Sequence, residues 1–103
     1  MILIGKDEIH KFSKKHAQSK KPLIAWAYLI SKSEFKDLNE LHKTFPSADY
    51  IYHKYTIFNI SGNKYRLAAM IDYDAQIISI QQIWTHAEYS RSKNQDALKR
   101  GSL

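Results

Sequence analysis

Two cations placed two residues apart are the feature of the sequence that most directly suggests chemistry. Lys64 and Arg66 lie in a segment with strand character, so both side chains project from the same face of that strand. Two fixed cations can bind a phosphate and stabilise the charge that develops on it in a transition state. The alternative is a solvated outer face, because lysine and arginine commonly occupy the exposed side of a sheet.

A second group of candidates lies at the start of a predicted helix. Thr85 and Glu88 have the spacing of a capping box, which begins a helix at His86. His86 could act there as a general acid or base, and Tyr89 shares its helix face and could donate a proton or stack on a base. The alternatives are an exposed histidine at a helix start and, for Tyr89, a hydrophobic staple with Trp84.

The other histidines do not indicate a metal centre. His10, His16, His42 and His53 show no ligand spacing that recurs with carboxylates. The chain also has no cysteine, which excludes a disulfide framework, a zinc–thiolate site and a cysteine nucleophile. We therefore expect no metal site.

Length and charge restrict the class of protein further. The 103 residues, 44% hydrophobic and 25% charged, are sufficient for one globular domain, and 16 basic against 10 acidic residues leave a net charge of +6. That surplus favours a polyanionic partner: nucleic acid, an acidic protein or an anionic membrane. The longest apolar run, 23–30, is too short to span a membrane, and the N-terminus lacks signal-peptide features. A cytoplasmic protein is expected.

Changes in hydrophobic periodicity predict the elements that position these residues. A short strand is expected at 1–4, a helix from Asp7, a second helix from Pro22 and a short helix from Asp37 to about Lys43. Strands are then expected at 50–52, 55–60, 64–73 and 76–84. The predicted fold is α+β, with the N-terminal strand and the helices packed on an antiparallel sheet in two layers.

The pairing of the last two strands can be predicted from their hydrophobic pattern. A two-residue loop at Asp74 and Ala75 would pair Ile71 with Ile78 and Tyr65 with Trp84. One face then carries the core residues Tyr65, Leu67, Ala69, Ile71, Ile78, Ile80 and Trp84. The other face carries Lys64, Arg66, Ala68, Met70, Ser79, Gln81, Ile83 and Thr85, which places His86 near the two cations.

Two peripheral segments are polar. The basic run Lys11, Lys14, Lys15, Lys20 and Lys21 is either a solvated helix face or a contact for RNA or the ribosome. Beyond Tyr89 only Ala97 and Leu98 are available for burial, so we expect a mobile or partner-dependent tail. The predicted division is a domain at 1–92 and a polar C-terminal tail at 93–103.

Three segments together resemble a known family. They are 45–49 (FPSAD), 58–67 (FNISGNKYRL) and 85–89 (THAEY), and they resemble the hallmark blocks of HigB-type toxins in the RelE superfamily of bacterial toxin–antitoxin systems. The resemblance extends over roughly residues 1–92, with the blocks in the same order and at the usual spacing. One position departs from it, because Ser90 stands where many relatives carry an acidic residue.

The resemblance implies an endoribonuclease, an mRNA interferase that cleaves messages, commonly on the ribosome, and so inhibits translation. It implies a RelE-like fold and a helix-turn-helix antitoxin, similar to HigA, through which alone the toxin would reach operator DNA. Such toxins are similar to metal-independent RNases, in which the ribose 2′-OH attacks the adjacent phosphate. No cofactor is implied, and no membrane partner.

The resemblance also implies roles for the residues that match its blocks. Arg66 and Lys64 would stabilise the phosphate, and His86 would perform acid–base chemistry with Tyr89 assisting or orienting it. Residues expected to contact RNA are Lys54, Asn59, Arg91 and Lys93.

Two other classes of function remain open at this point. ParE-like members of the superfamily poison DNA gyrase by binding, without catalysis. A plain RNA-binding module would bind RNA with a salt-dependent affinity and leave it intact. The cationic pair together with His86 and Tyr89 favours the nuclease, because a protein that only binds does not need them.

Overall fold

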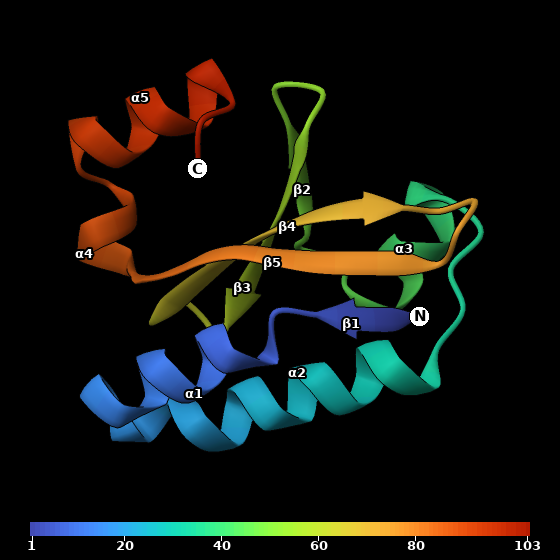
Figure 1. Ribbon diagram of the computed structural model, residues 1–103, viewed down its shortest axis with the longest axis horizontal. Helices are drawn as coiled ribbons and strands as arrows, with labels where there is room; N and C mark the ends of the chain where they lie inside the picture. Colours follow the sequence, from blue (N-terminus) through green and yellow to red (C-terminus); the bar gives the residue numbers. More distant parts are fainter.

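A five-stranded sheet forms the centre of the computed structural model, which describes all 103 residues (Figure 1). The strands follow the order β1-β5-β4-β3-β2, with bounds β1 (Ile2–Ile4), β2 (Asp49–Ile51), β3 (Tyr55–Ile60), β4 (Tyr65–Asp72) and β5 (Ile77–Thr85). The helices are α1 (Lys6–Lys15), the 3-10 turn η1 (Ala17–Ser19), α2 (Lys20–Lys32), α3 (Leu38–Thr44), α4 (His86–Tyr89) and α5 (Ser92–Arg100). The predicted α+β class is confirmed.

The sheet is mixed rather than wholly antiparallel. Strands β2 to β5 pair antiparallel, whereas β1 pairs with β5 in parallel, with Leu3 opposite Ile78. A parallel pair needs a long connection between its strands, and here the whole chain from α1 to β4 supplies it. The expectation that the N-terminal strand joins the sheet is therefore right, and the sheet around it is antiparallel in its other four strands.

Helices α1 and α2 lie side by side against one face of the sheet (Figure 1). The predicted stripe of α2 is buried at Leu23, Trp26 and Ile30, and these residues join the main core of the protein. The predicted cap of α3 is present, since the Glu40 amide donates to the Asp37 carboxylate at 3.0 Å. No helix in the structure has both the length and the apolar character that crossing a membrane requires.

A β-bulge in β5 changes the predicted register halfway along the strand. Ile71 lies opposite Ile78 and Ala69 opposite Ile80, as predicted, but Ala68 then lies opposite Gln82. Gln81 is therefore an extra residue without its own partner, and every later residue of β5 changes face.

The bulge makes three predicted placements wrong. Trp84 lies opposite Arg66 rather than Tyr65, and Thr85 lies opposite Tyr65. Ile83 turns to the helix-covered face and joins the main core. Trp84 joins instead a second buried cluster on the opposite face, with Tyr55, Ile57, Ala68 and Leu98.

The C-terminal segment does not match the expectation of a mobile tail. Helix α5 packs on the sheet face opposite α1 and α2, and its Leu98 is fully buried in the second cluster (Figure 1). The residues after α5 also contact the sheet, since the Leu103 amide donates to the Tyr55 hydroxyl at 3.2 Å. One buried leucine on an otherwise polar helix is sufficient because Trp84 and Tyr55 form an apolar surface for it. The domain boundary at residue 92 stays a prediction.

We expect Leu98→Ala to lower the free energy of unfolding by about 2–5 kcal/mol, because it removes a fully buried leucine and leaves a cavity. Urea denaturation followed by tryptophan fluorescence would measure this. Leu29→Ala is the matched control, since Leu29 is exposed on α2 and its truncation should change the stability by less than about 0.5 kcal/mol. If Leu98→Ala lowers the free energy of unfolding as little as Leu29→Ala does, the packing of α5 does not contribute to the stability of the fold.

Candidate active site on the sheet face opposite helices α1 and α2

Arg66 lies at the middle of a row of three side chains on the face opposite α1 and α2. It lies opposite Asn59 on β3 and opposite Trp84 on β5, and directly paired residues share a face. The row exists only because the bulge turns Trp84 to this side. The buried Trp84 therefore forms the apolar floor beside a half-buried arginine.

The guanidinium of Arg66 is held by its own segment of chain. Its Nη1 donates to the Tyr65 carbonyl at 3.1 Å, and its Nη2 donates to the Asn63 side-chain oxygen at 3.1 Å. The guanidinium carbon lies 5.9 Å from the centre of the Tyr89 ring, within reach of a cation–π interaction. Lys11 is the only basic residue that forms salt bridges in the protein, so Arg66 has no carboxylate partner. Its remaining N–H groups are free to bind a phosphate.

Lys64 and His86 are brought together by the chain at the ends of β4 and β5. The His86 amide donates to the Lys64 carbonyl at 2.9 Å, one step beyond the pair of Tyr65 and Thr85. Both side chains are exposed. The predicted proximity of His86 to the cationic segment is thus present, although it arises from this backbone pairing and not from the predicted register.

The predicted capping box holds His86 at the first position of α4. The Glu88 amide donates to the Thr85 hydroxyl at 3.2 Å, and the Thr85 amide donates to the Glu88 carboxylate at 2.9 Å. Such a reciprocal cap satisfies two of the free amides at a helix start. The side chain of His86 is therefore presented from a defined backbone, although α4 is only one turn long.

Tyr89 lies where it can serve both as the staple partner of Trp84 and as a proton donor beside Arg66. Its ring lies 5.4 Å from that of Trp84, which confirms the staple geometry, and it also faces Arg66. Burial raises the pKa of the Tyr89 phenol, and the nearby Asp49 and Tyr52 raise it further, while Gln95 and Arg66 act in the opposite direction. A phenol with a raised pKa keeps its proton at neutral pH, so it can donate but not accept one.

The residues expected to contact RNA are not all gathered here. Asn59 is exposed beside Arg66, and Arg91 and Lys93 are exposed at the corner between α4 and α5. Lys54 lies at the other end of β3, and its ammonium donates to the Gly101 carbonyl at 2.6 Å. That contact is typical of a lysine at a helix C-terminus and gives Lys54 a structural role.

Two residues that contribute to the site were not singled out from the sequence. Asn63 belongs to one of the three matching blocks, but only the structure shows its oxygen on the Arg66 guanidinium. Trp84 lies on the face of Arg66 and not on the predicted core face, because of the bulge. No group of three or more His, Cys, Asp or Glu side chains is placed to hold a metal ion.

Comparisons with known proteins agree with this fold. Residues 19–92 match the family described as HigB_toxin, a RelE-like toxic component of a toxin–antitoxin system. Two curated relatives are the mRNA interferase toxin HigB of Escherichia coli K12 and the mRNA interferase HigB of Shigella flexneri. Each is 34% identical over 91 residues, covering 86% of this chain and 88% of the relative.

The fold and these matches first define a class, the RelE-like toxic components of toxin–antitoxin systems. Within that class this chain belongs to the HigB toxin family. Membership implies an antitoxin as a partner, since the family is defined as one half of a toxin–antitoxin pair.

Proposed function

We propose that this chain is an endoribonuclease that cleaves mRNA and so inhibits translation. The observation that carries the proposal is the guanidinium of Arg66, which is fixed by two hydrogen bonds and free of any carboxylate on the sheet face opposite α1 and α2. Its relatives are named mRNA interferases. Because the half-buried Arg66 keeps part of its surface accessible, the phosphate of a polymer can reach it.

The residues around Arg66 supply what 2′-OH attack on a phosphodiester needs. A base removes the 2′ proton, the oxygen bonds to phosphorus, and the 5′ oxygen leaves with a proton from an acid, giving a 2′,3′-cyclic phosphate and a 5′-OH end. Arg66 and Lys64 would neutralise the added charge on the phosphorane. His86 would act as the acid–base group, and the neutral phenol of Tyr89 would donate a hydrogen bond or proton.

The expected partners follow from the same proposal. mRNA would be bound on the ribosome, with Asn59, Arg91 and Lys93 along the RNA path and Trp84 beneath it. The antitoxin would be a helix-turn-helix protein similar to HigA, which would carry the toxin to operator DNA. The exposed Lys11, Lys14 and Lys15 in the second half of α1 would add affinity for RNA that falls with increasing salt.

Tyr89→Phe separates the catalytic role of the phenol from its packing. The ring stays on Trp84, so the stability should change by less than about 1 kcal/mol, whereas loss of the donated proton should lower the cleavage rate by at least about 10²-fold. Because burial raises its pKa above the usual 10.0, the phenol keeps its proton and the contribution of Tyr89 should be constant from pH 7 to about pH 9. Rate–pH profiles of both proteins test this, and an unchanged rate in Tyr89→Phe would leave only the staple role.

The function itself is tested with purified protein and a defined mRNA, with and without translating ribosomes. Cleavage should give a 5′-OH and a 2′,3′-cyclic phosphate, both identifiable by end-labelling before and after phosphatase treatment. Intact RNA in both reactions, with growth still arrested in cells, would overturn the proposal and indicate a binding poison. DNA damage on induction would then specify gyrase as the target.

A further inference from the structure

Helix α2 has a second apolar stripe that the fold does not bury. Leu23, Trp26 and Ile30 face the core, but Ile24 and Tyr28 remain 53% and 62% exposed one position further round the helix. A helix that covers one face of a sheet needs only one apolar face for its packing. Large apolar side chains exposed together on a second face indicate a binding surface.

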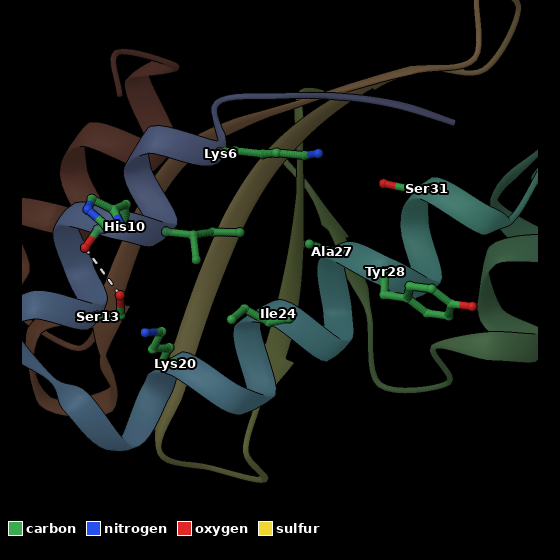
Figure 2. Close-up of a pocket in the computed structure, with 9 residues that line it drawn as sticks. Lys6, His10, Ser13, Lys20, Ile24, Ala27, Tyr28 and Ser31 are labelled. Carbon is green, nitrogen blue, oxygen red and sulfur yellow. Dashed lines mark hydrogen bonds between the residues drawn. The ribbon is translucent and has the colours of Figure 1, made fainter.

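This second stripe forms one wall of the largest hollow of the molecule, a groove of about 450 Å³ between α1 and α2 (Figure 2). Ile9 of α1 and Ala27 of α2 line it together with Ile24 and Tyr28. Figure 2 shows His10 and Ser13 on α1 along one side and Ile24 and Tyr28 on α2 along the other. A groove lined by apolar side chains is the kind of surface that receives the apolar face of an amphipathic helix.

The charges around the groove are positive. Lys6 and Lys20 line it, no carboxylate does, and α2 contains no acidic residue. The Lys32 ammonium lies 5.7 Å from the centre of the Tyr28 ring and extends the cationic rim. The nearest acidic residues of α1, Asp7 and Glu8, each lie 3.8 Å from Lys11 instead.

We propose that the groove between α1 and α2 binds an acidic amphipathic helix of the antitoxin. The apolar side of that helix would cover Ile24 and Tyr28, and its carboxylates would pair with Lys6 and Lys20. The apolar lining favours a protein over RNA, which presents phosphates and sugars to a cationic groove. The inference rests on membership of a toxin–antitoxin family and does not depend on the proposed nuclease activity.

The groove and the candidate active site lie on opposite sides of the sheet. Helices α1 and α2 cover the sheet face opposite Arg66 and Trp84, so a helix bound between them leaves the candidate active site open (Figure 1). An antitoxin segment held there acts as an anchor and does not itself block RNA. Inhibition would then require a second segment or an obstructed approach to the ribosome.

Calorimetry with the purified cognate antitoxin and the full-length toxin tests the proposal. Tyr28→Ala and Lys20→Glu should each weaken binding at least about tenfold. Tyr50→Ala and Lys43→Glu are matched controls, since Tyr50 is 48% exposed on β2 and Lys43 is exposed on α3, and both should bind like the wild type. Circular dichroism confirms folding, which Lys20→Glu should preserve because an acidic residue suits a helix start.

Amide chemical-shift mapping of labelled toxin with the antitoxin gives the second readout. Shifts should include Ile24, Tyr28 and Ser31. Wild-type affinity in both groove variants, or shifts confined to the face of Arg66, would overturn the proposal. Variants that lose affinity for RNA but not for the antitoxin would overturn it in favour of an RNA-binding groove. Cleavage measured in parallel separates the two proposals, because an inactive toxin that still binds through the groove contradicts only the nuclease.

Discussion

Arg66→Ala is expected to lower the rate constant for RNA cleavage by about 10²- to 10³-fold, because it removes a preorganised donor to the developing phosphorane. The effect should appear in the single-turnover rate at saturating protein, with a smaller change in RNA affinity. Labelled mRNA on ribosomes, sampled over time and resolved on a denaturing gel, gives both quantities.

Two further arginine variants make this result specific. Arg66→Lys keeps the charge but loses the fork that donates to Asn63 and the Tyr65 carbonyl, so it should retain only part of the activity. Arg100→Ala removes an exposed arginine at the end of α5 and should cleave like the wild type. An Arg66→Ala protein that is folded and fully active would show that the phosphate is bound elsewhere.

His86→Ala is expected to lower the cleavage rate by about 10²- to 10⁴-fold, the usual contribution of a positioned acid or base. The side chain is exposed and makes no hydrogen bond, so the stability should be nearly unchanged. Added imidazole should restore part of the rate in His86→Ala and leave the wild type unaffected. Single-turnover assays with increasing imidazole measure this.

The matched control for His86 is His53→Asn. His53 is also exposed, and it lies in the turn between β2 and β3 with φ of 53°, a conformation that asparagine tolerates. This variant should cleave normally. A His86→Ala protein that matches it in rate would assign the acid–base work to another group, with Tyr89 the first to examine.

Local sequence signals predicted the helix starts well. The Asp37 cap of α3 and the capping box at Thr85 and Glu88 are both present, because each depends only on residues within one turn. The buried stripe of α2 and the four β-strands after residue 49 were also predicted from periodicity. Such features need no knowledge of what packs against them.

The bulge in β5 was missed although the sequence carries a signal for it. Gln81 and Gln82 stand together between the inward-facing Ile80 and Ile83, and two successive polar residues break the strict alternation of a strand. A regular ladder without a bulge places Trp84 on the helix face. The composition of the candidate site therefore could not be predicted fully, since Trp84 reaches Arg66 only through this irregularity.

The docking of α5 was not predictable from local patterns. Leu98 appears isolated in a polar segment, and its burial depends on Tyr55, Ile57, Ala68 and Trp84, which are distant in sequence. The bond between Asn63 and Arg66 is short-range, but a sequence specifies no side-chain conformation for it. The resemblance to HigB toxins, in contrast, predicts membership of that family, and the family comparison confirms it.

Primer extension on cellular mRNA after brief induction of wild-type protein and of Arg66→Ala tests the central claim most directly. The proposed function predicts new 5′ ends inside translated frames with the wild type and their absence with the variant. Growth arrest by the wild type without new 5′ ends would contradict the nuclease and identify a toxin that acts by binding alone.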